Sequence, residues 1–165
     1  MGDQACSSPE ARQFDFWLGE WDLTWPAEQA GGGPGETMTG TNHITRLFGA
    51  CVIEENFATS DRSFLGRSLS VYDEKAGTWR QTWVDSSGAF LSFTGGLDDD
   101  AMVLATEPVS DADSVVVNRM VFSDITPESL HWQWQKSTEG GGNWSDLWTI
   151  TYKRRPLNRF CVDFG

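Results

Sequence analysis

The chain has 165 residues, with 12 Lys and Arg against 24 Asp and Glu, and so carries a formal net charge of -12. A chain of this length is the size of one ordinary domain and can bury about 70% of its unfolded surface, so it needs no disulfide or metal to fold. The acidic composition, with no run of basic residues, argues against nucleic acid or an anionic membrane surface as a partner.

Apolar residues recur at every second position far more often than at every third or fourth, which predicts a mainly β chain. We expect an N-terminal arm (1–13), a single barrel domain (14–155) and a C-terminal tail (156–165), with one short helix at 9–16 before the first strand. The predicted strands are 17–25, 37–48, 51–59, 63–72, 78–85, 89–96, 102–107, 114–123, 130–137 and 147–154.

Turn signals separate these strands at short intervals, for example GGGPG at 31–35 and EGGGN at 139–143. Connections this short join antiparallel neighbours, so the strands form a meander. About ten strands must stack as two sheets or close on themselves to hide their edges. We therefore predict an all-β fold, an antiparallel up-and-down β-barrel of about ten strands with the short N-terminal helix capping one end.

The first strand places three aromatic or apolar side chains on one face. Trp21, Leu23 and Trp25 share that face by the two-residue period, and polar residues occupy the other. The aromatic face is therefore expected to point inward. Gly19 suits a tight bend at the barrel end, where Trp21 forms the floor.

Several motifs together carry a family resemblance. The G-x-W of the first strand, with Arg154 and Arg155 at the end of the last, resembles the calycin superfamily, which includes the lipocalins; there the Trp closes the barrel base and an Arg packs over its ring. FDFWLGEWDL, GRSLSVYDEKAGTWRQTWVDSSG (66–88) and FSDITPESLHWQWQKSTEGGGNW (122–144) resemble the bacterial domain-of-unknown-function family 1579, a lipocalin-like group. The resemblance implies a fold and carries over no catalytic residue.

A pocket is indicated by aromatic and polar residues that share strand faces. Trp79, Gln81, Trp83 and Asp85 fall on one face of their strand, and a buried amide or carboxylate needs a partner, water or a polar ligand. Flat aromatic walls with a few polar groups suit a small molecule. Two alternatives remain open: Asp85 caps the SSG turn at the strand end, and the tryptophans fill a solid core.

The predicted ligand-binding residues combine these walls and anchors with two arginines. Arg67 and Arg119 each lie on a face with apolar residues, where an Arg pairs with a carboxylate or reaches a ligand anion, unless that face points to solvent. The ligand-binding candidates are Trp25, Arg67, Gln81, Trp83, Arg119, Trp132 and Trp134.

Candidate acid/base residues are Asp85, Glu55 and His43, whose pKa apolar walls would shift. The two histidines, His43 and His131, lack the spacing of metal ligands, so we expect no metal. No P-loop and no G-x-G-x-x-G opening a helix occurs, so we also expect no cofactor.

The three cysteines, Cys6, Cys51 and Cys161, are an odd number at wide spacings and predict reduced thiols. No apolar run is long enough to span a bilayer, and no leader precedes the domain, so we expect a soluble, cytoplasmic protein. A homodimer is compatible with these features.

Three functional hypotheses follow. The first is a barrel that binds a small hydrophobic or aromatic metabolite. The second is a cofactor-independent enzyme, an isomerase, cyclase or lyase, that acts on an apolar intermediate in the same cavity. The third is an interaction module with a filled barrel, whose exterior or tail contacts a partner.

Overall fold

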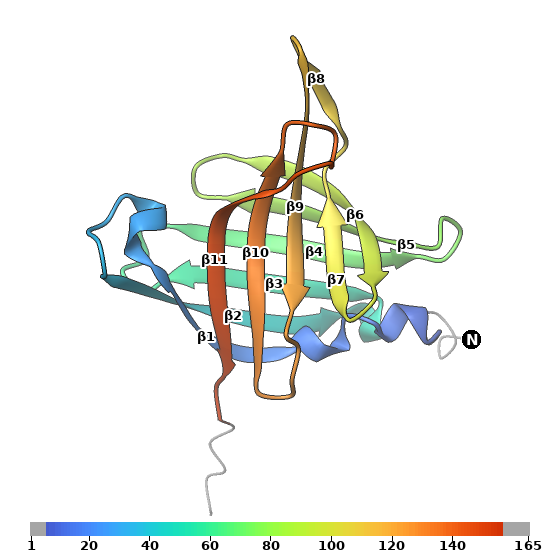
Figure 1. Cartoon of the computed structure of the whole chain (residues 1–165). Helices are drawn as coiled ribbons and strands as arrows, with labels where there is room; N and C mark the ends of the chain where they lie inside the picture. Colours follow the sequence, from blue (N-terminus) through green and yellow to red (C-terminus); the bar gives the residue numbers. More distant parts are fainter. Residues whose placement is uncertain (1–5, 157–165) are drawn as a thin grey trace, which may run out of the picture.

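The structure is a computed structural model of the chain, of which residues 6–156 are described. Within these residues, β1 to β11 form one antiparallel sheet (Figure 1). The strands are β1 (Gly19–Pro26), β2 (Thr37–Leu47), β3 (Val52–Thr59), β4 (Leu65–Asp73), β5 (Thr78–Asp85), β6 (Phe90–Asp98), β7 (Ala101–Ala105), β8 (Val109–Asp111), β9 (Ser114–Ser123), β10 (Ser129–Ser137) and β11 (Ser145–Arg154).

Ten of these strands close into a barrel. Each pairs with its neighbours along the chain except where β7 pairs with β9, and β1 pairs with β11 to close the ring. The remaining strand, β8, pairs only with the start of β9, and this hairpin projects beyond the barrel (Figure 1). The all-β, antiparallel up-and-down barrel predicted from the sequence is therefore confirmed.

Strict alternation of side chains builds the barrel interior. In β1, Trp21, Leu23 and Trp25 are buried whereas the residues between them are exposed. In β3 the buried positions alternate in the same way and include Ile53, Glu55 and Phe57. Successive side chains of a strand point to opposite faces, so every second residue enters the core.

The barrel base joins the two ends of the chain around one arginine. The guanidinium of Arg154 lies 4.1 Å from the centroid of the Trp21 ring and donates hydrogen bonds to the carbonyls of Leu18, Phe16 and Pro127. Gly19 has a φ of 122°, and a Cβ there would lie 2.5 Å from Arg154 Nη1. The predicted bend at Gly19 and the cation over the floor tryptophan are both present.

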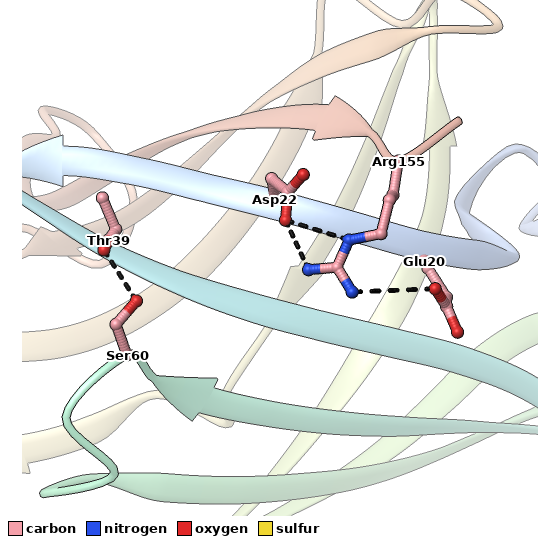
Figure 2. Close-up of polar contacts among 5 residues, drawn as sticks. All are labelled: Glu20, Asp22, Thr39, Ser60 and Arg155. Carbon is pink, nitrogen blue, oxygen red and sulfur yellow. Dashed lines mark hydrogen bonds and ion pairs between the residues drawn. The ribbon is translucent and has the colours of Figure 1, made fainter. Parts of the chain in front are cut away.

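Arg155 follows directly but lies outside the barrel. Its Nη2 donates to Asp22 Oδ1 at 2.5 Å, and its Nη1 lies 3.7 Å from Glu20 Oε2 (Figure 2). Figure 2 also shows the hydroxyl pair of Thr39 and Ser60, 2.6 Å apart, between β2 and the turn after β3. Exposed contacts of this kind contribute little to stability.

The N-terminal segment lies at the end of the barrel where β1 begins. It forms two short 3-10 turns, η1 (Glu10–Arg12) and η2 (Asp15–Trp17), in place of the single helix expected at 9–16. Phe14 is fully buried, with its ring edge-on to Trp79 at 5.3 Å and to Phe122 at 5.1 Å. These aromatic contacts hold the segment against this end of the barrel, where a cap was predicted.

The prediction of reduced thiols is wrong for two cysteines. Cys6, which precedes η1, and Cys51, in the turn between β2 and β3, form a disulfide with a Cα–Cα distance of 5.0 Å. The fold brings together two residues that are 45 positions apart, which spacing alone does not reveal. Cys161 and nearly all of the predicted tail lie outside the described residues.

The predicted strand ranges agree closely with the structure, and those at 78–85 and 114–123 match β5 and β9. The one strand missed is β8, which has three exposed residues and so carries no burial pattern. None of the helices among residues 6–156 has the length and apolar character needed to cross a membrane.

Candidate functional site

A cavity of about 180 Å³, partly open to solvent, lies inside the barrel. Its walls come from inward-facing positions of most barrel strands, from η2 and from the turn before β4. The lining residues are Trp17, Glu55, Phe57, Phe64, Gln81, Trp83, Asp85, Leu91, Phe93, Met120, Phe122, Trp132, Trp134, Trp148, Ile150 and Tyr152.

The aromatic walls hold one another in place by edge-on contacts. The Trp148 ring centroid lies 5.7 Å from those of Phe57 and Trp132, with interplanar angles of 85° and 88°. Trp25 does not line the cavity; it packs behind Trp148 at 5.5 Å. Aromatic pairs favour this geometry, so these contacts stabilise the walls in the observed arrangement.

A glycine makes room for one of the walls. Gly66 of β4 lies opposite Asp85 of β5, and a Cβ built on it would lie 2.0 Å from the Trp83 ring. Only the absence of a side chain therefore lets the six-membered ring of the Trp83 indole approach the backbone of β4 so closely. Trp83 Nε1 donates to Asp85 Oδ2 at 2.9 Å, which fixes the ring from its other end.

One buried carboxylate anchors a polar cluster at the cavity wall. Glu55 of β3 is 6% exposed; its Oε1 accepts from Asn42 Nδ2 and its Oε2 from the Ser68 hydroxyl, both at 2.6 Å. Asn42 Nδ2 also donates to the Tyr152 hydroxyl oxygen at 3.1 Å. Four strands, β2, β3, β4 and β11, thus contribute one residue each.

Burial changes the titration of this cluster. Removal from water raises the pKa of Glu55 from 4.5 to about 7, although the hydrogen bonds from Ser68 and Asn42 oppose the rise. Burial and the nearby Glu55 charge together raise the pKa of Tyr152 well above its usual 10. Glu55 is therefore poised to exchange a proton near neutral pH, and Tyr152 remains a neutral phenol.

Gln81 contributes an acceptor that lacks a protein partner. The side chain is 4% exposed and lines the cavity, and its Nε2 donates to the Ser70 hydroxyl at 2.8 Å. Its Oε1 has no hydrogen-bond partner among the described residues. A buried amide oxygen in this state costs free energy, which a ligand donor would recover after a small rotation of the side chain.

Asp85 combines the two roles that the sequence left open. Its Oδ1 accepts from the backbone N–H groups of Ser87 and Ala89 and from the Ser87 hydroxyl, so it caps the turn after β5. It also lines the cavity. Partial burial raises its pKa, but the hydrogen bonds from Ser87, Trp83 and Ala89 outweigh burial and lower it, so Asp85 stays ionised.

Besides Trp25, three predicted site residues lie outside the cavity: His43, Arg67 and Arg119. His43 is exposed and lies beside Glu20 of β1, because its neighbour Asn42 takes the inward position. Arg67 points outward with its side chain 68% exposed, and its Nη1 lies 3.6 Å from Glu54 Oε1.

Arg119 is also placed away from the cavity lining. Its guanidinium lies 3.9 Å from the centroid of the Trp144 ring, and its Nε donates to Gln135 Oε1 at 2.7 Å. In β9 the inward positions are taken by Met120 and Phe122. Of the alternatives that the sequence left open, Arg67 takes the outward one and pairs with a carboxylate, and Arg119 lies outside the cavity lining.

The sequence did not predict the lining residues Trp148 and Tyr152, nor the two hydrogen-bond donors to Glu55, Asn42 and Ser68. Trp148, Ile150 and Tyr152 alternate in β11, and this period-two signal would have placed all three inward. Asn42 and Ser68 lack such a signal because small polar residues occur on both faces of a strand.

The molecule is thus defined as a closed antiparallel β-barrel with an aromatic-walled cavity that is partly open to solvent. No cluster of three or more His, Cys, Asp or Glu that could hold a metal occurs within residues 6–156. The chain belongs to the family described as Protein of unknown function (DUF1579), which matches it over residues 8–154. No match was found among curated proteins.

Proposed function

We propose that the protein binds a small apolar or aromatic molecule in its barrel cavity. The observation that carries this proposal is the cavity itself, about 180 Å³ in volume and walled by rigid aromatic side chains. A barrel that served only as an interaction module would gain stability by filling this space, because an empty cavity forfeits packing energy.

The cavity volume limits the ligand to about one aromatic ring with a short substituent. An apolar cavity of about 150 Å³ accommodates benzene in another protein, so 180 Å³ leaves room for a few further atoms. Glu55 and the unpartnered oxygen of Gln81 supply polar contacts at the wall. Such a combination orients a flat molecule that carries a polar group.

A second candidate function is a cofactor-independent isomerase, cyclase or lyase in the same cavity. The observation that favours it is Glu55, a buried carboxyl at the cavity with a pKa of about 7. A general acid or base works best when its pKa lies near the operating pH. Of the three predicted acid/base residues, Glu55 is the one that keeps this role, since His43 is exposed and Asp85 is ionised and engaged in a turn.

Native mass spectrometry of the purified protein and calorimetric titration with one-ring and two-ring aromatic molecules test the binding. Leu91→Trp would fill the cavity, and Ser92→Trp, on the outer face of the same strand, is the matched control. We expect saturable binding that Leu91→Trp abolishes and Ser92→Trp preserves. A panel without saturable heat or bound mass, or full affinity in Leu91→Trp, would contradict the proposal. Conversion of a bound molecule that Glu55→Gln abolishes would support the enzyme.

The remaining predictions about partners and location stay predictions. We expect no nucleic-acid or membrane partner, since the chain carries a net charge of -12. The homodimer and the cytoplasmic location await measurement of the mass in solution and of the compartment. The Cys6–Cys51 disulfide bears on location, because disulfides persist mainly outside the reducing cytosol.

A further inference from the structure

The cavity carries negative charge without a compensating cation. Glu55 and Asp85 both line it, and none of the described lining residues is Lys, Arg or His. Among residues 6–156, no Lys, Arg or His side chain lies within ion-pair distance of either carboxylate. The groups that hydrogen-bond to Glu55 are neutral: an amide from Asn42 and a hydroxyl from Ser68.

Aromatic side chains make up most of the cavity wall. The faces of aromatic rings carry partial negative charge and attract cations within about 6 Å, most strongly over tryptophan. Five tryptophans, four phenylalanines and one tyrosine line the cavity. The tryptophans are Trp17, Trp83, Trp132, Trp134 and Trp148.

The nearby arginines do not neutralise the interior. Arg67 lies on the outer surface beside Glu54, and Arg119 is stacked on Trp144. Arg154 is fixed at the barrel base by three backbone carbonyls. These three arginines therefore have structural partners of their own, and the carboxylate of Glu55 has none of opposite charge within the described chain.

Resting on the ligand-binding function proposed above, we propose that the ligand is a small organic cation, an aromatic or alkyl amine that is protonated at neutral pH. Its ammonium group would lie at Glu55, and its apolar part would pack against the tryptophan walls. A buried carboxylate beside an aromatic enclosure recognises ammonium groups through both ion pairing and cation–π attraction.

Binding of a cation also resolves the cost of burying Glu55. A carboxylate buried without a charged partner is less stable than the same group in water, and a hydrogen-bonded cation offsets part of that cost. An anion would meet two carboxylates, and a neutral molecule would supply no charge to pair with the ionised form of Glu55. The net charge of -12 also raises the local concentration of cations around the molecule.

Three probes of nearly equal size separate charge from shape: 2-phenylethylamine, 2-phenylethanol and phenylacetate, which are cationic, neutral and anionic at pH 7.5. Calorimetric titration of the full chain is expected to give at least tenfold tighter binding of the amine than of the alcohol, and no detectable binding of the acid. In Glu55→Gln, which keeps the shape of the side chain, the amine should lose at least tenfold in affinity and the alcohol less than threefold.

The outcomes distinguish this inference from the function on which it rests. If the alcohol binds as tightly as the amine, or if Glu55→Gln weakens both equally, the cation inference is overturned while binding of apolar molecules stands. If none of the three probes and no other aromatic molecule binds, both fail. Glu54→Gln, at the neighbouring outward position of β3, is the matched control and should leave the affinities for all three probes unchanged.

Discussion

Replacing Glu55 with glutamine should stabilise the folded protein above neutral pH. The carboxyl is buried, and its pKa rises from 4.5 to about 7 on folding, mainly through loss of hydration. Each pKa unit corresponds to 1.36 kcal/mol, so ionisation of Glu55 costs the folded state about 3 kcal/mol at pH 8. An amide removes that cost and still accepts from Asn42, while its NH₂ group faces the Ser68 hydroxyl.

The sign follows from the direction of the shift. Because folding raises the pKa of this acid, its contribution to stability is fully present below pH 4.5 and is lost as the pH rises through about 7. The wild-type protein should therefore lose about 2.5 kcal/mol between pH 5 and pH 8 from this group alone. Glu55→Gln, which has no such group, should lack this part of the pH dependence.

Urea unfolding at pH values from 4.5 to 8.5 measures the effect in both proteins. At pH 8 the variant should exceed the wild type by about 3 kcal/mol in unfolding free energy, or roughly 6–12 °C in Tm for a chain of this size. Glu54→Gln, at the neighbouring outward position of β3, is the control and should leave the pH profile unchanged. Parallel pH profiles for wild type and Glu55→Gln, or a variant less stable at pH 8, would refute the reasoning.

Three further perturbations test the base, the cavity wall and the cross-link. Gly66→Ala places a methyl against the Trp83 ring, so it should cost about 1–3 kcal/mol in unfolding free energy and weaken ligand binding in calorimetry. Arg154→Lys loses the fork that reaches three carbonyls and should cost about 2–4 kcal/mol in urea unfolding, against less than about 1 kcal/mol for Arg155→Lys. Cys51→Ser opens a loop of 45 residues and should lower stability by up to about 4 kcal/mol under non-reducing conditions.

For each of these three predictions, one outcome would contradict the physical reason given. Gly96→Ala is the control for the wall, since nothing lies within 4 Å of a Cβ there, and an equal effect of both glycine variants would rule out the contact with Trp83. If Arg154→Lys and Arg155→Lys lower the unfolding free energy equally, the contacts of Arg154 at the barrel base contribute no more than a surface ion pair. Unchanged stability of Cys51→Ser, or free thiols in the wild type by alkylation and mass spectrometry, would contradict the cross-link.

The fold was predictable because the strands are short and alternate cleanly. The parity of β1 and β5 placed Trp21, Gln81 and Trp83 inward, and the structure agrees. The register shift in β10 falls between Trp134 and Gln135, after the two tryptophans, so it did not invert their assignment. The arginine over the floor tryptophan was implied by the resemblance to the calycins and not by strand parity.

The candidate site was predictable only in part. Around His43 the strand reads TGTNHIT, where polar residues occupy both faces, so hydrophobic alternation could not show that Asn42 and not His43 points inward. The Glu55 cluster depends on the registers of β2, β3, β4 and β11, which bring residues 42, 55, 68 and 152 together. The residue-by-residue pairing of β11 with β1, which are far apart in the sequence, cannot be predicted from the residues of either strand alone.

Closure of the barrel by its first and last strands has a consequence for how the chain folds. The pair of Trp21 and Arg154 joins residues that are 133 positions apart, so the ring cannot be completed until nearly the whole domain has been synthesised. Contacts of such long range carry a large entropy of loop closure and make folding slow, on the scale of milliseconds to seconds for comparable β topologies. Until β11 joins β1, both strands expose unpaired edges, and the nascent chain is then most vulnerable to aggregation.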